Sequence, residues 1–283
     1  MKHCVIMTVY TDVTQVNRFI STLPEDWDIY IHLDKKSEIA IKDINPKAYV
    51  IKRYNIYWGS FKHVSAFMHL LDIACQKDRY DYYHLITGQD FWAKPHYDIM
   101  RNLNGDNIYV DIVSDPTWYN GGYDIYAYDT LSRFCDIRIP LYRRLNKVYK
   151  TLQDYLGLKR KKPKYAIYGG SVYCSLTNEA VKECLDSPIA DDLLHKLKYS
   201  SIGEEIFFQT ILMNSRLRTR IVKDNLRYID WSGEVRPKVL TADDFVKINE
   251  SNAVFCRKVD SRISSELIDK IIDYYDLDNN TDI

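Results

Sequence analysis

The sequence lacks several features that would place it in other classes of protein. Lys and Arg together number 39, as do Asp and Glu, so the formal net charge is zero, whereas a general nucleic-acid-binding protein would carry a basic excess. None of the six cysteines forms a CxxC pair, which excludes the common zinc and dithiol motifs. No apolar run approaches the roughly 18 residues of a membrane span, and no signal peptide is recognised. We therefore expect a cytoplasmic protein that binds any anionic ligand through local positive charge.

The composition fits a folded α/β protein. Of the 283 residues 46% are hydrophobic, and no repeat or low-complexity segment divides them, so we expect one domain over residues 1–283. The 24 tyrosines are unusual. A tyrosine ring can stack on sugars or bases, although most tyrosines serve the core and the surface strands.

The first third of the chain alternates strand and helix patterns. Apolar runs predict strands at 4–9, 28–33, 49–53 and 82–86, and helical spacing predicts helices at 14–23 and 63–76. This order favours an open, mostly parallel sheet with helices on both faces. Because ligands bind beyond the carboxyl ends of such strands, Asp34 and residues 88–91 are site candidates by position.

The rest of the chain is less regular. The pattern predicts strands at 107–113 and 226–230, a Tyr/Gly/Asp-rich loop at 116–128, helices at 140–156, 177–185 and 242–249, and two strands around a Gly169-Gly170 turn at 165–176. The basic stretch 159–164 (KRKKPK) is interpreted as a solvated linker, with a mobile acceptor or phosphate lid as the alternative.

Residues 200–210 are the most informative about chemistry. Ser201 followed three residues later by Glu204 is a capping box, which predicts a helix start and gives Glu204 a structural role. Glu205 then lies about 100° further round the helix, beside apolar residues. Such surroundings can raise the pKa of a carboxylate into the range of a general base. The alternative is that both glutamates only favour the helix N-terminus.

Basic residues follow the last predicted strand. They are Arg236, Lys238 and the pair Arg257-Lys258, and Trp231 precedes them at the strand end, where it can stack on a sugar or pack in the core. A diphosphate leaving group needs its developing charge neutralised, either by a divalent metal or by fixed Lys and Arg side chains.

The sequence favours basic residues over a metal at such a site. Metal-dependent sugar transferases usually carry Asp-x-Asp after a sheet strand. The matching position here is Gly88-Gln89-Asp90, which has one acid.

Seven segments, in order, resemble the core-2/I-branching enzyme family, which includes the β-1,6-N-acetylglucosaminyltransferases and is similar to the peptide O-xylosyltransferases. The segments are 31–36 (IHLDKK), 57–60 (YWGS), 83–91 (YHLITGQDF), 170–177 (with Gly170-Ser171 and Leu176-Thr177), 204–210 (EEIFFQT), 226–231 (LRYIDW) and 255–260 (FCRKVD). The resemblance covers most of the chain and implies a GT-A fold with an inverting, metal-independent transfer from a UDP-sugar.

The resemblance also implies roles for single residues. Glu205 aligns with the catalytic glutamate of a Pro-Asp-Glu motif, in which Gly203 and Glu204 replace the Pro and the Asp. Further residues align with ligand-binding positions: Lys258 and Arg236 with the diphosphate (Lys238 being the alternative to Arg236), Asp34, Trp58 and Asp90 with the donor, and Trp231 and Ser171 with the acceptor.

These alignments predict which part of the chain binds the donor and which binds the acceptor. Residues 1–115 would form the nucleotide-sugar half, and residues 116–283 the acceptor and catalytic half. The donor sugar is expected to be N-acetylglucosamine, then xylose or another hexose, and the acceptor a glycan or glycolipid in bacterial surface-polysaccharide synthesis. Peripheral association with the inner membrane face, through a lipid-linked acceptor, would follow. No metal, other cofactor or nucleic acid is expected.

Two rival hypotheses stay open at this point. One is a non-catalytic carbohydrate-binding protein on a transferase fold, since fold alone does not prove activity. The other is a metal-dependent GT-A enzyme that binds its metal at or near Asp90.

Overall fold

The computed structural model describes residues 1–103, 105–233 and 236–277. Its strands are β1 (His3–Val9), β2 (Asp28–Leu33), β3 (Tyr49–Ile51), β4 (Tyr82–Thr87), β5 (Asp90–Trp92), β6 (Ile108–Tyr109), β7 (Cys174–Thr177), β8 (Ile221–Val222), β9 (Arg227–Ile229) and β10 (Phe255–Arg257). Its α-helices are α1 (Val13–Ser21), α2 (Lys62–Lys77), α3 (His96–Asn102), α4 (Tyr123–Ala127), α5 (Pro140–Tyr155), α6 (Asn178–Asp186), α7 (Pro188–Lys196), α8 (Glu204–Met213), α9 (Phe245–Glu250) and α10 (Ser265–Tyr275).

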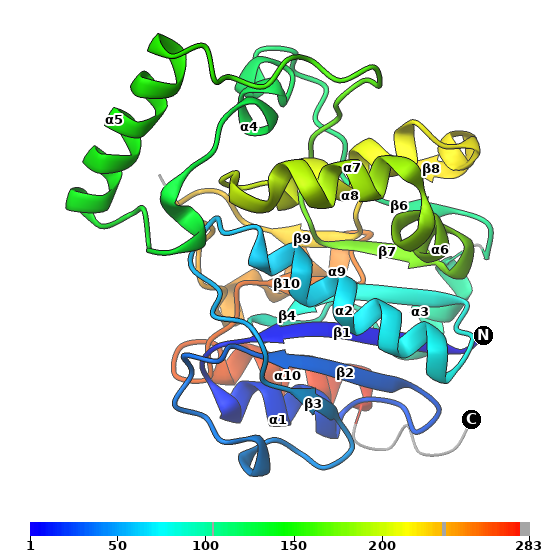
Figure 1. Cartoon of the computed structure of the whole chain (residues 1–283). Coiled ribbons are helices and arrows are strands. Elements are labelled where there is room, and N and C mark those ends of the chain that lie inside the picture. The colour runs from blue at the N-terminus through cyan, green and yellow to red at the C-terminus, as the bar shows by residue number, and fades with distance from the viewer. Residues whose placement is uncertain (104, 234–235, 278–283) are drawn as a thin grey trace.

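The described strands form two sheets (Figure 1). The larger sheet has the order β3-β2-β1-β4-β7-β6-β8, and the smaller one the order β5-β10-β9. In the larger sheet β1 pairs in parallel with β2 and β4, β2 with β3, and β6 with β8. Only β7 runs against its neighbours β4 and β6. The predicted mostly parallel sheet is therefore confirmed.

Helices cover both faces of the larger sheet, and β1 shows why. All seven of its residues are buried, and alternate side chains of a strand point to opposite faces. Val5, Met7 and Val9 enter the core shared with α1 and α10, whereas Cys4 and Ile6 enter the core shared with α2, α6, α7 and α8. A strand buried on both faces needs the continuous apolar run that the sequence has here, and the predicted α/β class is confirmed.

Several local predictions were wrong, although the helices expected at 14–23, 63–76, 140–156 and 177–185 are present with ends shifted by one or two residues. The strand expected at 107–113 is restricted to Ile108–Tyr109, and of the two expected at 165–176 only β7 forms. The loop expected at 116–128 contains α4, which starts after Gly121 and Gly122. These glycines have φ of 65° and 81°, so they form a left-handed turn into a helix rather than ending regular structure.

The topology brings distant segments to one edge of the larger sheet. The carboxyl ends of β1, β2 and β4 lie there because these strands are parallel. β7 is antiparallel and begins at the same edge, where Cys174 pairs with Leu85. The small sheet continues from this edge, since Asp90 pairs with Arg257.

Buried imidazoles lie on both sides of this sheet. Burial lowers the pKa of His3, His32 and His96 to about 4, because removal from water penalises the charged ring. His96 packs edge-on against Trp92 with ring centroids 4.5 Å apart, and neither of its ring nitrogens bonds to a described residue.

We predict that His96 contributes to acid sensitivity of the fold. The folded pKa lies below the unfolded value of about 6.5, so the stability that depends on the neutral ring is complete above that pH and is lost as pH falls toward 4. In urea unfolding, His96→Leu should lose about 1 kcal/mol less per pH unit than the wild type between about pH 6 and 4.5. Its stability near pH 7.5 should be equal or greater. An unchanged pH slope would contradict this assignment.

Candidate active site

Helix α8 begins at Glu204, after Gly203, and the predicted capping box does not form. The side chain of Ser201 makes no cap bond. Ser201 instead pairs with Ser60 as an isolated antiparallel bridge, and the Ile202 amide donates to the Gly59 carbonyl at 2.7 Å. Pairing with a distant segment therefore replaces the local cap, and the structural role predicted for Glu204 was wrong.

Gly203 is fixed by its neighbours. A Cβ at this position would lie 2.8 Å from Phe61 and 3.4 Å from Leu197, and the first distance is shorter than side chains tolerate. The glycine that stands where the family motif has proline is therefore required by close packing against the segment that leads into α2.

Two carboxyl groups open α8, and both have raised pKa values. Burial, with a smaller effect of neighbouring Glu205, raises the pKa of Glu204 to about 8. Burial, with a smaller effect of Asp111, raises the pKa of Glu205 to about 7. The two groups titrate as a coupled pair whose proton loss is shifted toward neutral pH. A carboxyl poised near neutral pH has the property expected of a general base.

The loop before β7 connects these carboxyls to Asp111. The Gly170 amide donates to the Glu205 carbonyl at 2.8 Å, and the Ser171 amide donates to Asp111 Oδ2 at 2.9 Å. Gln209 on α8 donates to the Ser171 carbonyl at 2.7 Å. Ser171, predicted on the acceptor side, therefore lies beside the start of α8.

Tyr173 connects the carboxyl groups to a second, basic region. The Arg257 guanidinium lies 3.7 Å from the centre of the Tyr173 ring. Burial raises the pKa of Tyr173 to about 12; Arg257 opposes this shift, while Glu204 and Glu205 add to it. Since such effects fall off with distance, the ring lies within range of both Arg257 and the two carboxyls.

Asp90 lies in the protein interior next to Arg257. It is completely buried, accepts bonds from the Thr87 amide at 2.9 Å and the Thr87 hydroxyl at 2.6 Å, and lies 3.6 Å from Arg257 Nε. Asp90, which was predicted to contact the donor, has no exposed surface in this structure, and its carboxylate lies against Arg257.

The basic region is a cluster around Lys258. Burial lowers the pKa of Lys258, and the positive charges of Arg257, Arg236 and Arg138 lower it further. Like charges held close together favour an anionic ligand. Lys238, the alternative to Arg236, bonds Asp244 at 2.7 and 2.9 Å, and this pair makes Arg236 the better candidate.

The remaining predicted residues lie around the same edge. Asp34 is 5% exposed and accepts from the Lys36 ammonium at 2.6 Å and the Lys36 amide at 2.9 Å. Trp58 and Trp231 are 50% and 66% exposed. Trp231 follows β9, whose Ile229 pairs with Arg257, so it lies near the same strand ends as Lys258.

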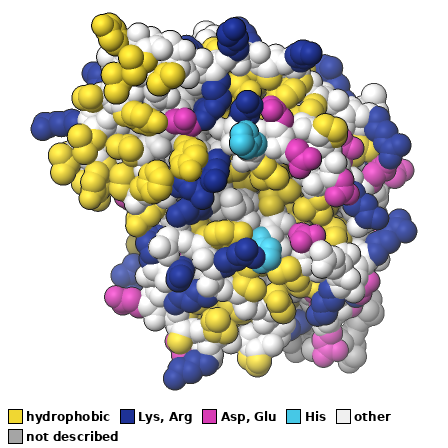
Figure 2. Space-filling model, in the orientation of Figure 1, with side chains coloured by type: hydrophobic (Ala, Val, Ile, Leu, Met, Phe, Trp, Pro, Cys, Tyr) yellow, Lys and Arg dark blue, Asp and Glu magenta, His cyan; other side chains and the backbone are white. Residues whose placement is uncertain are grey.

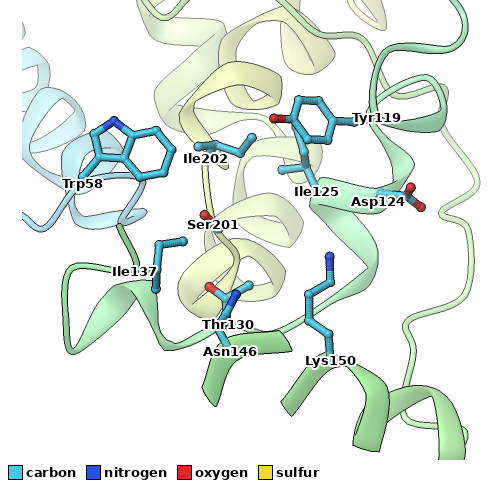
Figure 3. A pocket seen from close by; sticks show the side chains of 10 residues that line it. All are labelled: Trp58, Tyr119, Asp124, Ile125, Thr130, Ile137, Asn146, Lys150, Ser201 and Ile202. Atoms are coloured by element: carbon cyan, nitrogen blue, oxygen red, sulfur yellow. The ribbon is translucent and has the colours of Figure 1, made fainter. Parts of the chain in front are cut away.

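A cleft of about 230 Å³ lies against the segment that precedes α8 (Figure 3). Trp58, Tyr119 and Ile202 give it aromatic and aliphatic walls, and Asn146 and Lys150 reach it from α5. The charge of Glu205 contributes to the raised pKa of Tyr119 after the larger effect of burial, which connects the cleft to the carboxyl pair. Flat rings with a few polar groups are typical of sugar-binding surfaces.

Comparison with known proteins identifies the family. The Core-2/I-Branching enzyme family model matches residues 6–252. The chain belongs to the Core-2/I-Branching enzyme family. The predicted resemblance to this family is thereby confirmed. No curated protein sequence matches the chain.

Two solved structures are similar to it at low identity. One is the apo structure of the bifunctional glycosyltransferase WbbM, with 13% identity, a TM-score of 0.44, and coverage of 98% of this chain and 50% of that one. The other is the apo form of the glycosyltransferase GlyE of Streptococcus pneumoniae TIGR4, with 12% identity, a TM-score of 0.41, and coverage of 97% and 60%. The chain thus spans half the length of the first and three-fifths of the second.

Sequence reasoning missed several residues of this candidate site. Asp111, Tyr119, Tyr173 and Arg138 carry no local pattern that marks them, and they meet only through the fold. Arg257 adjoins Lys258 in the sequence, a pairing that could have signalled it. Within the described ranges, no group of three or more His, Cys, Asp or Glu side chains could hold a metal ion.

We predict that Gly203→Ala destabilises the protein. The added methyl group would overlap Phe61, and overpacking of this kind costs about 1–3 kcal/mol. Gly105→Ala is the matched control, because nothing lies within 4 Å of its added Cβ. Urea unfolding of both variants should show the loss for position 203 alone; equal stabilities would refute the packing argument.

Proposed function

We propose that this chain is an inverting, metal-independent glycosyltransferase that moves a sugar from a UDP-sugar to an acceptor hydroxyl. The observation that carries the proposal is that a carboxyl of raised pKa, Glu205, and Arg257, a member of the cation cluster at Lys258, both lie within electrostatic range of Tyr173. Base and anion site are the two functions that such a reaction requires.

The proposed reaction is a single displacement. Glu205 accepts the proton of the acceptor hydroxyl, the acceptor oxygen bonds to the anomeric carbon, and the bond from that carbon to the UDP oxygen breaks. Attack opposite the leaving group inverts the configuration. UDP departs with its new negative charge stabilised by Lys258 and Arg236, with Arg257 behind them.

Fixed cations suit this task because they are in place before charge develops. Asp90 and Tyr173 hold Arg257, so little reorganisation is needed when the bond breaks. Under this proposal Asp34 and Trp58 contact the donor, while Ser171 and Trp231 contact the acceptor. The donor sugar is proposed to be N-acetylglucosamine, then xylose or another hexose, and the acceptor a glycan of a surface polysaccharide.

We predict that Glu205→Gln lowers kcat by about 10²–10⁴-fold while UDP binding stays nearly intact, because general-base catalysis contributes about that factor. Wild-type kcat/KM should rise with pH through about 7, as Glu205 ionises. Glu204→Gln is the matched control, since Glu204 Oε2 is buried and bonds to no described residue, and it should lose far less activity. A fully active Glu205→Gln enzyme would refute the mechanism. A chain that binds sugars but transfers none would favour the carbohydrate-binding alternative.

We predict that Lys258→Ala weakens UDP binding by about 10–100-fold, the value of a hydrogen bond to a charged group. Isothermal titration in EDTA is the measurement, and the wild type should bind and react equally well with EDTA present. Lys238→Ala should reduce stability through loss of its pair with Asp244 while leaving UDP affinity within about threefold. Activity lost in EDTA and restored by Mn²⁺ would favour the metal-dependent alternative.

A further inference from the structure

The apolar face of helix α5 points away from the rest of the protein, whereas that of an ordinary surface helix packs on the core. The helix stands away from the sheets at the upper left of Figure 1, and Gln153 is its one buried residue. Its bonds to the rest of the protein come from polar side chains. Gln153 exchanges bonds of 2.9 Å with the Asp129 backbone, Asn146 accepts from the Leu131 amide at 2.9 Å, and Asp154 accepts from Tyr128 at 2.7 Å.

The apolar side chains of α5 point to solvent instead. Leu141, Leu145, Val148, Leu152 and Tyr155 are all exposed, Val148 by 65% and Tyr155 by 85%. Their spacing of three and four residues places them in one stripe along the helix. Leu156 and Leu158 continue the apolar surface past the end of the helix, and Figure 2 shows hydrophobic side chains gathered at this corner of the molecule. An apolar stripe of this length on a free surface indicates a binding surface.

The charges beside the stripe identify its occupant. Residues 140–164 contain nine Lys and Arg and a single acid, Asp154, and that acid accepts the Tyr128 hydroxyl. Arg144 and Lys147 are exposed next to the apolar stripe, and Arg143 is exposed further round the helix. A basic helix with one apolar face matches the surface of an anionic bilayer, where acyl chains accept the leucines and headgroups accept the cations. A second copy of this chain would oppose cations with cations.

We propose that α5 binds the surface of an anionic lipid bilayer, lying in its plane with Leu141, Leu145, Val148, Leu152 and Tyr155 immersed. No described helix has the length and apolar character needed to cross a membrane.

The position of α5 beside the cleft gives this binding a consequence for the substrate. Asn146 and Lys150 of α5 line the cleft that ends at Ser201 and Ile202, directly before α8 (Figure 3). A bilayer bound to the apolar stripe, on the opposite side of α5, would therefore lie one helix diameter, roughly 10 Å, from the cleft. Resting on the proposed function, this assigns the acceptor to the class of lipid-linked glycans, whose saccharide reaches Glu205 from the membrane surface.

Vesicle co-sedimentation tests the proposal without any substrate. The wild type should pellet with vesicles of phosphatidylcholine and phosphatidylglycerol, less with phosphatidylcholine alone, and less as salt rises. Replacement of Leu145, Val148 and Leu152 by Ser should weaken binding at least about tenfold. The matched control replaces three exposed aliphatic residues elsewhere, Ile41, Val246 and Ile263, and should bind like the wild type.

A second variant, Arg144→Gln with Lys147→Gln, keeps the apolar stripe and should lose the preference for phosphatidylglycerol, so the test does not depend on folding of the first variant. Wild-type protein that stays in the supernatant, or binding unchanged in both variants, overturns the proposal. A dimer in light scattering that the serine variant dissociates also overturns it, in favour of a second copy. UDP binding measured without vesicles should be equal in all variants, so loss of the proposed function would appear separately.

Discussion

The site depends on the burial of Asp90 against Arg257. A carboxylate without solvent contact is costly unless a cation and hydrogen bonds compensate it, and the two Thr87 bonds and Arg257 supply both. This requirement holds the end of β10 against the end of β4. Arg257 is buried, and Lys258, the next residue, is partly exposed. The buried pair thus fixes the residue beside Lys258 and supports the Tyr173 ring.

The parts of this arrangement that could be predicted from the sequence are those encoded locally. The apolar runs of β1, β2 and β4 are long enough to mark a parallel sheet, and the rule that ligands bind at its carboxyl edge then selects Asp34 and the 88–91 segment. The capping box at Ser201 failed because its residues pair with Ser60, some 140 positions earlier in the chain. Asp90 was assigned to the right edge, but its burial against Arg257 was not predicted, because only tertiary packing decides whether a carboxylate there is exposed or buried.

The orientation of helix α5 on the protein surface likewise could not be predicted from the sequence. Its periodicity predicts an amphipathic helix correctly, and the usual expectation is that the apolar face packs on the domain. The bonds of Asn146, Gln153 and Asp154 reverse that orientation. No property of a helical wheel distinguishes the two orientations, since the wheel is the same in both. The orientation of α5 is set by segment 128–131, whose backbone groups and Tyr128 side chain offer the helix hydrogen-bond partners rather than an apolar surface.

The pKa of Glu205 depends on whether a cation lies close to its carboxyl group. A guanidinium or ammonium group within about 4–6 Å of Glu205 would lower its pKa by one to three units and make it a weak base. The pKa of Glu205 is raised instead, by burial and by Asp111. Arg257 acts on both Tyr173 and Lys258, whereas burial and Asp111 set the pKa of Glu205. In the proposed reaction the diphosphate meets the positive charge, while the base keeps its affinity for a proton until the acceptor arrives.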